Sequence, residues 1–235
     1  MDGQLKTLID LQTFDTRIAG LEGEAVKLPK EIEAVRARTA EAKKTVDAAK
    51  AGLDTARKET RAREKDLEDN QVKRQKFEGQ LYQVKTNKEY SAVLAEIEEV
   101  KQQKSKIEEE ILTLMERQER LAAEIKDAEG GLKAAESEGA TAEKQLRERL
   151  AAVETELGGV KGERASVARG LPANVLADYD RLLRARAGLA IVPVIKPNLC
   201  GACRMTVTPQ RLQELRAQNA LLACESCGRY LYWQA

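Results

Sequence analysis

The sequence predicts a mainly α-helical protein, in which a long antiparallel coiled-coil hairpin precedes a small cysteine-rich C-terminal module. Three observations lead to this fold class. Of the 235 residues, 34% are charged and only 3% are aromatic, which is typical of long helices and not of a wide globular core. Apolar residues recur at alternating steps of three and four over most of the chain. All four cysteines lie after position 199.

Two heptad series predict the two arms of the hairpin. The first is unbroken over residues 18–84, and most of its a and d positions are apolar. Pro29 removes one hydrogen bond from the helical ladder, but the register continues across it. The second series begins at Tyr90 and continues to Val160 with one phase shift.

The phase of the heptads breaks between Val84 and Tyr90, which are six residues apart where a heptad needs seven. Inside this gap Thr86 is followed three residues later by Glu89, a capping box that starts a new helix. We therefore expect a helix–helix turn near residue 86. One continuous helix is the alternative, because no glycine or proline marks the turn.

Folding the chain at residue 87 places small side chains opposite large ones, as a narrow two-helix seam requires. Val35, for example, then faces Gly139. The seam is imperfect between residues 60 and 74, where Thr60, Asn70 and two arginines occupy core positions. We interpret this stretch as loosely packed, with long side chains that reach solvent, and a hinge is the alternative.

The expected turn is basic. Residues 73–88 carry five basic residues and one acidic residue, a net charge of +4 (five minus one). Lys85 and Lys88 flank the turn and Tyr82 precedes it, and cations beside an aromatic ring can hold phosphates and stack bases. These three residues are candidate contacts for a nucleic acid or a partner protein. The alternative is a solvated charge run.

The helical pattern ends at several glycines followed by Leu171 and Pro172. The predicted organisation is a hairpin over residues 1–170, a short connecting helix within 171–189, and a module over 190–235. Within the module the sequence predicts strand-like segments and one short helix. The strands are expected at residues 190–195, 205–208, 221–223 and 230–233, and the helix at 209–216.

The module contains two Cys-x-x-Cys pairs separated by twenty residues, a strong signal for a metal site. Two such turns place four thiolates around one ion, so the predicted ligands of a single Zn²⁺ are Cys200, Cys203, Cys224 and Cys227. Rubredoxin-type iron is the alternative, because four thiolates suit either metal.

The residues that follow the two cysteine pairs differ. Gly228 after the second pair favours a tight turn whose N–H groups approach sulfur. Arg204 takes the matching place after the first pair, so we expect that half to be less regular. Arg204 and Arg229 belong to the five basic residues that outnumber two acidic ones after residue 189, and they are further candidate contacts.

Composition also argues against several function classes. The chain has no histidine, the commonest general base, and it has no P-loop or dinucleotide-binding glycine motif, so we expect no enzyme. A net charge of +1 gives no global field for nucleic acid. No apolar run is long enough for a membrane span and the first residues lack a secretory pattern, so we expect a cytoplasmic protein without membrane contact.

Three segments together resemble the bacterial C4-type zinc-ribbon proteins that carry an N-terminal coiled-coil hairpin. They are LYQVKTNKEYSAVLAEI from Leu81 to Ile97, the pairs CGAC and CESC, and CGRYLY from Cys227 to Tyr232. The resemblance covers essentially the whole chain. It implies a helical hairpin on a zinc ribbon and a nucleic-acid-binding or transcription-associated role.

The expected function is thus a non-enzymatic zinc-ribbon adaptor that contacts nucleic acid or a transcription-associated protein. The alternative is a protein–protein scaffold or chaperone-like adaptor that binds no nucleic acid. We expect one Zn²⁺ per chain, no small-molecule substrate and a monomer.

Overall fold

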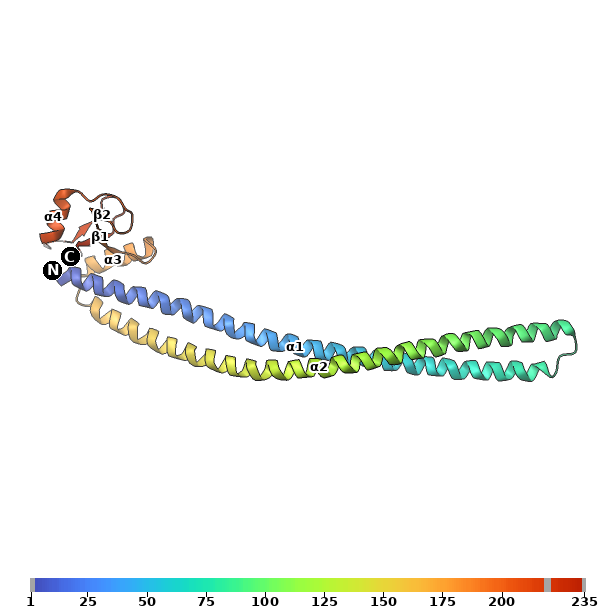
Figure 1. Cartoon of the computed structure of the whole chain (residues 1–235). Coiled ribbons are helices and arrows are strands. Elements are labelled where there is room, and N and C mark those ends of the chain that lie inside the picture. Colours follow the sequence, from blue (N-terminus) through green and yellow to red (C-terminus); the bar gives the residue numbers. More distant parts are fainter. Residues whose placement is uncertain (1–2, 218–220, 234–235) are drawn as a thin grey trace. The chain divides into compact units, whose positions relative to one another are not determined.

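The structure is a computed structural model that describes residues 3–217 and 221–233. Two long helices form the predicted hairpin: α1 spans Gly3–Leu81 and α2 spans Asn87–Ala168 (Figure 1). The C-terminal module contains α3 (Ala173–Ala185), β1 (Ile191–Ile195), β2 (Leu199–Cys200), α4 (Pro209–Ala217), β3 (Leu222–Ala223) and β4 (Tyr230–Trp233). The predicted fold class is confirmed. None of the described helices is both long and apolar enough to cross a lipid bilayer.

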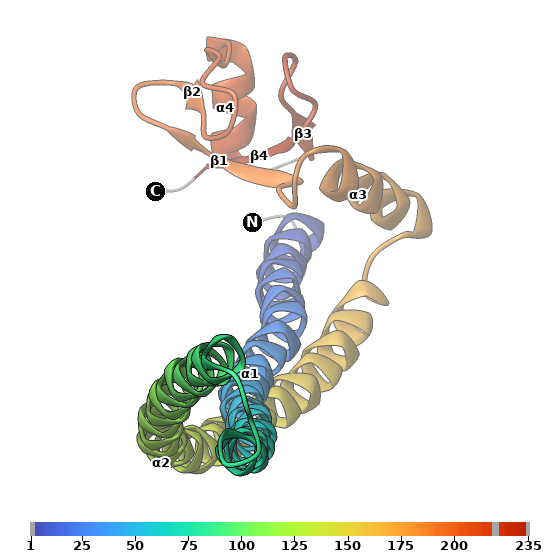
Figure 2. The same ribbon diagram turned by 90° about the vertical axis from the view of Figure 1, so that its right-hand side faces the viewer.

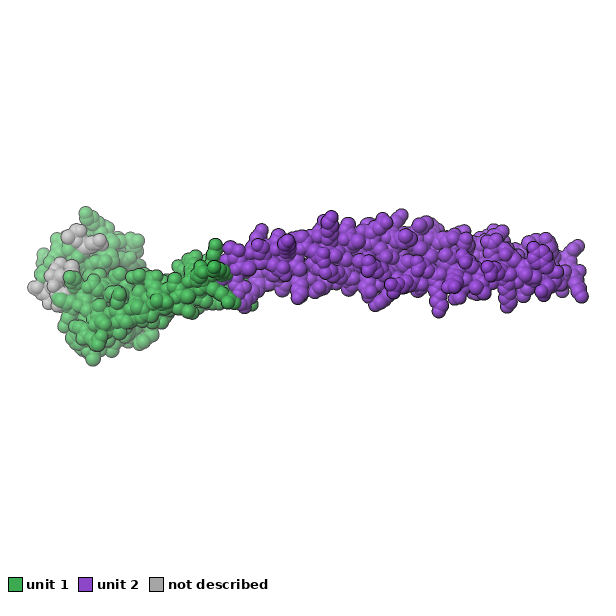
Figure 3. Space-filling model, turned by 90° about the horizontal axis from the view of Figure 1, so that it is seen from below, with its two compact units in different colours: residues 1–33, 144–235 green, residues 34–143 purple. Residues whose placement is uncertain are grey.

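The chain divides into two compact units, which are coloured separately in Figure 3. One unit, the base unit, combines residues 1–33 with residues 144–235. The other, the arm unit, comprises residues 34–143. The division passes through both long helices, so the start of α1 and the end of α2 belong with the C-terminal module.

The seam of the arm unit follows the antiparallel pairing that the sequence predicts. A Cβ atom on Gly139 would lie only 2.9 Å from Thr39 Oγ1 and 3.6 Å from Val35 Cγ1, so a glycine lets the two helices approach here. Ion pairs join the helices along the flanks, such as Lys50 Nζ to Glu129 Oε1 at 2.6 Å. The apolar core of the seam includes Val46, Ala56, Ile97 and Val100.

Polar side chains interrupt the seam where the sequence predicts imperfect packing. Thr60 is 8% exposed and Asn70 is 4% exposed. Gln118 Nε2 donates to Thr60 Oγ1 at 2.6 Å, whereas Asn70 Nδ2 lies 3.5 Å from Gln103 Oε1, the limit for a hydrogen bond. Asn70 Oδ1 is buried without a partner among the described residues. A buried amide that is only partly bonded costs stability.

The turn between the long helices is closed by the capping box. Glu89 N–H donates to Thr86 Oγ1 at 3.3 Å, and Thr86 N–H donates to Glu89 Oε2 at 3.2 Å. These bonds satisfy main-chain donors at the start of α2. The hydrogen bond with Thr86 lowers the pKa of the Glu89 carboxyl, and the main-chain N–H groups of Lys85 and Thr86 lower it further.

In the base unit, the first turns of α1 pack against α3 and β1, at the end of the hairpin where α1 begins (Figure 2). Leu8 and Leu11 are fully buried against the equally buried Tyr179 of α3 and Ile191 of β1. This shared apolar core explains why the residues near the N-terminus group with the C-terminal module.

Gln12 on α1 binds the beginning of β1 as a neighbouring strand would. Its Oε1 accepts from the main-chain N–H groups of Ala190 and Ile191, both at 2.7 Å, and its Nε2 donates to Ile191 O at 2.7 Å. One side chain therefore satisfies three main-chain groups that would otherwise lie partly buried and unpaired.

A charged cluster joins α1, α2 and α3 in the base unit. Arg164 donates to Asp15 Oδ1 at 2.9 Å and to Asp180 Oδ1 at 2.6 Å, and Tyr179 OH donates to Asp15 Oδ2 at 2.8 Å. Burial opposes the charge on Arg164, but the two carboxylates outweigh burial and raise the pKa of its guanidinium. Burial and the Asp15 carboxylate raise the pKa of Tyr179.

The four strands form one sheet in the order β2-β1-β4-β3. β1 and β4 are parallel, with Ile191 opposite Tyr230 and Val194 opposite Trp233, and the outer pairs are antiparallel. The predicted strand at residues 205–208 is wrong, because that segment makes a single bridge, between Thr206 and Leu199. Its N–H and C=O groups instead close the first cysteine turn.

Candidate metal centre

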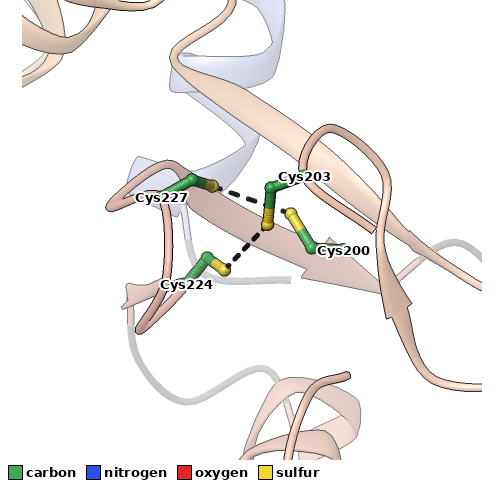
Figure 4. Close-up of side chains that lie close together, drawn as sticks. All are labelled: Cys200, Cys203, Cys224 and Cys227. Carbon is green, nitrogen blue, oxygen red and sulfur yellow. Dashed lines mark hydrogen bonds between the residues drawn. The ribbon is translucent and has the colours of Figure 1, made fainter. Parts of the chain in front are cut away.

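The four cysteine sulfurs converge on one point beside the sheet (Figure 4). All four Sγ atoms lie within 4.8 Å of one another. Cys200 Sγ lies 3.8 Å from Cys227 Sγ, and Cys203 Sγ lies 3.7 Å from Cys224 Sγ. Zn–S bonds of about 2.3 Å place the sulfurs of a tetrahedron about 3.8 Å apart, so the observed spacings fit a single Zn²⁺.

The two cysteine turns follow the same main-chain path. Arg204 N–H donates to Cys200 O at 3.0 Å, and Gly228 N–H donates to Cys224 O at 2.8 Å. Both donors have left-handed backbones, with φ of 61° at Arg204 and 74° at Gly228. The expectation of a less regular first half is therefore wrong for the backbone. Arg204 adopts a conformation that glycine favours, at a cost of about 1 kcal/mol.

Gly201 allows the first cysteine turn to approach β1. Its N–H donates to Pro193 O at 2.8 Å, and a Cβ atom at this position would lie 2.6 Å from the same oxygen. A side chain here would push the turn away from the sheet. The sequence shows Gly201 inside the first Cys-x-x-Cys pair, but nothing in that spacing predicts the contact with Pro193.

The thiols differ in their electrostatic surroundings. Burial raises the pKa of Cys200 to about 12 and also raises the pKa of Cys224. Burial opposes ionisation of Cys227 as well, but the main-chain N–H and the side chain of Arg229 outweigh it, and the pKa of Cys227 falls to about 6. Zinc binding requires all four thiolates, and the charge of the ion stabilises them.

Comparison with known proteins identifies the domains. Residues 11–188 match the family described as the CT398-like coiled coil hairpin domain. The chain belongs to this family. Residues 199–231 match the C4-type zinc ribbon domain, which agrees with the cysteine geometry. The protein is thus a coiled-coil hairpin with a zinc ribbon that binds one Zn²⁺.

Solved structures share this fold at low sequence identity. CT398 from Chlamydia trachomatis is 22% identical, with 98% of each chain covered and a TM-score of 0.86. HP0958 from Helicobacter pylori is 18% identical, with 100% of this chain and 98% of that chain covered and a TM-score of 0.66. A protein from Mycobacterium smegmatis is 18% identical, with coverages of 98% and 97% and a TM-score of 0.70. No curated protein matches the sequence.

The candidate contacts at the hairpin turn are open to solvent. Tyr82 is 90% exposed, and Lys85 and Lys88 are exposed too. Neither lysine forms an ion pair within the part of the chain that the structure describes. Arg74 pairs with Glu78 at 2.8 Å, which leaves four of the five basic residues of this segment available: Lys73, Lys76, Lys85 and Lys88.

The two candidate arginines of the zinc ribbon differ in their environment. Arg204 is exposed next to Met205, whose side chain is 55% exposed. Arg229 instead folds its guanidinium onto main-chain carbonyls, with Nε donating to Leu189 O at 2.7 Å and Nη2 to Arg186 O at 3.0 Å. The structure therefore separates two residues that the sequence groups together.

The aromatic residues of β4 contribute to packing. Tyr230 and Tyr232 pack against the core that contains Tyr179, and Tyr230 OH donates to Asp178 Oδ2 at 3.0 Å. Trp233 packs against the core around the cysteines, and the Arg216 guanidinium lies 4.4 Å from its ring centre.

Proposed function

We propose that this protein is a non-enzymatic adaptor that binds nucleic acid through the turn of its hairpin. The exposed lysines and tyrosine of that turn carry the proposal. The basic turn surface, defined as Lys73, Lys76, Tyr82, Lys85 and Lys88, combines four cations with one aromatic ring. Lysines neutralise phosphates and release counterions, and an exposed tyrosine offers a face on which a base can stack.

The chemistry of the metal centre supports a binding role. Four cysteines complete the tetrahedron of a zinc ion and leave no open position for water or substrate. The sequence contains no histidine to act as a general base near neutral pH. A zinc ribbon of this kind stabilises a small domain that presents a surface to a partner.

A protein–protein scaffold or chaperone-like adaptor is the second candidate. The same end of the hairpin carries exposed apolar surface, because Tyr90 is 46% exposed and Leu94 is 43% exposed. A cavity of about 440 Å³ lies beside them and is lined in part by Val84, Val93 and Glu96. Apolar surface next to charge suits a protein partner such as a transcription-associated protein.

Charge reversal at the turn tests the proposal. The variant Lys85→Glu/Lys88→Glu is compared with Lys126→Glu/Lys133→Glu, which makes the same charge change at exposed lysines elsewhere on α2. Binding of a mixed RNA and DNA pool is measured at two salt concentrations. We expect the turn variant to bind all sequences more weakly and to flatten the salt slope by about two units, with little change in the control.

The outcomes separate the two candidates. Equal losses in both variants would show a general charge effect and contradict a site at the turn. Unchanged nucleic-acid affinity, with a melting curve like that of the wild type, would remove the proposal. Loss of a protein partner that survives nuclease treatment would favour the scaffold.

A further inference from the structure

The second cysteine turn is connected to the end of α3 by one side chain. Arg229 follows Gly228 and is the counterpart of Met205 in the first turn, since Cys224 N–H donates to Arg229 O at 2.8 Å as Cys200 N–H donates to Met205 O at 2.9 Å. The Met205 side chain is 55% exposed, whereas the Arg229 guanidinium donates to two carbonyls of the base unit. Equivalent main-chain positions thus carry side chains with different environments.

The two carbonyls bracket the turn that leads from α3 into β1. Arg186 and Leu189 lie on either side of Ala187 and Gly188, whose backbones are both left-handed, with φ of 53° and 81°. Gly188 N–H donates to Leu183 O at 2.9 Å, so the turn caps α3. A cation at this position also interacts favourably with the C-terminal end of the helix.

The metal centre needs a cation nearby. A zinc ion with four thiolates has a net charge of −2, and buried charge is costly unless it is compensated. Arg229 interacts with Cys227 through both its main-chain N–H and its side chain. The corresponding Arg204 is exposed, and no hydrogen bond from its guanidinium is found in the described part of the chain.

We propose that Arg229 is a positioning residue that couples Zn²⁺ binding to the α3–β1 turn. When the ion holds the second cysteine turn, the backbone of Gly228 and Arg229 directs the guanidinium to Arg186 O and Leu189 O. The same guanidinium stabilises the thiolate of Cys227. Because linkage is reciprocal, an ordered α3–β1 turn strengthens zinc binding as much as zinc binding orders the turn.

The test uses the full chain and a matched pair of variants. Arg229→Met removes the cation and its donors but keeps a flexible apolar stem, and Arg204→Met removes the same charge from the equivalent half of the ribbon. Zinc affinity is measured by competition with a chromophoric chelator. Hydrogen exchange of the Gly188 and Leu189 amides is measured in the zinc-loaded protein.

We expect Arg229→Met to weaken zinc binding by about tenfold or more, as partners of metal ligands commonly do. The Gly188 and Leu189 amides should exchange about tenfold faster while the amides of Val192 and Val194 in β1 stay protected. Arg204→Met should change neither quantity more than about twofold. A four-sulfur absorption spectrum with Co²⁺ shows that the ligands are intact in each variant.

Three results would overturn the proposal. Zinc affinity and turn protection that both stay at wild-type values would show that Arg229 has no such role. Faster exchange at the turn with unchanged zinc affinity would make it a structural link only. An equal loss of zinc affinity in Arg204→Met would show a general charge effect. If Arg229→Met does not give the Co²⁺ spectrum, Arg229→Lys carries the test, with an affinity expected between wild type and Arg204→Met lowered by less than tenfold.

Discussion

The arm unit and the base unit achieve stability in different ways. In the arm unit, residues 34–143, the same antiparallel contact repeats along the seam, and even a partly unsatisfied amide at Asn70 is accommodated. In the base unit, single side chains join distant segments, as Gln12 does with Ile191 across 179 positions. A repeated seam distributes its energy over many positions, whereas the base unit depends on a few contacts and on the metal.

The largest contrast should appear on loss of a metal ligand. Cys224→Ser leaves an incomplete tetrahedron, so the zinc ribbon should lose its ion and unfold, because binding of a structural zinc is worth about 10–16 kcal/mol in small zinc domains. The arm contains no cysteine and should stay helical. Metal analysis, limited proteolysis and far-ultraviolet circular dichroism check both parts.

Ser226→Ala is the matched control for Cys224→Ser, because Ser226 is exposed in the same cysteine turn. It should retain zinc and protease resistance. Full zinc occupancy in Cys224→Ser, with the protease resistance of the wild type, would contradict the assigned ligand set.

A medium effect is expected at Gln12. Gln12→Ala removes three hydrogen bonds and leaves the N–H groups of Ala190 and Ile191 without their acceptor. The free energy of unfolding of the base unit should fall by about 2–3 kcal/mol. Gln102→Ala, at an exposed glutamine of α2, should change stability by less than about 0.5 kcal/mol. Denaturant unfolding compares the two, and equal values would contradict the role of Gln12.

The opposite sign is expected in the arm. Asn70→Leu replaces a buried, incompletely bonded amide by an apolar side chain of similar size, so the arm should gain about 1 kcal/mol. Amide exchange near residue 70 reports the change. A loss of stability would show instead that Asn70 specifies the register of the two helices.

The smallest effect should follow from acidification of the turn. The pKa of Glu89 is lowered in the folded protein by its bonds to Thr86 and to the Lys85 N–H. Its contribution is therefore present above the unfolded pKa of about 4.3 and is lost as the pH falls through the lower folded value. Exchange at the Thr86 amide should rise in that acid range in the wild type. Glu89→Gln should remove this pH dependence, and a dependence that persists would assign it to another group.

Local pattern explains which parts of this structure the sequence predicts. The arms, the turn at Thr86 and the cysteine cluster depend on heptads, a capping box and a paired motif, all of which are visible over short spans. β2 has only two residues, which is too short for any periodic signal. The bridge from Leu199 to Thr206 replaces the strand expected at residues 205–208 for the same reason.

The contacts that sequence reasoning misses are long-range and polar. Gln12, Asp15 and Arg164 look like ordinary solvated positions on charged helices, and no spacing relates them to α3 or β1. Arg204 and Arg229 both look like basic residues beside cysteines, but the path of the backbone exposes one and turns the other inward. Such differences arise from tertiary packing, which a single sequence does not display.

Hydrogen exchange of the full chain, before and after removal of zinc by a chelator, tests the central distinction between the two units most directly. The amides of residues 34–143 should keep their protection, because the seam that stabilises them contains no metal ligand. The amides of β1, β4 and the α3–β1 turn should lose theirs. Loss of protection throughout residues 34–143 on chelation would contradict the account, because it would make the arm part of a single zinc-dependent unit.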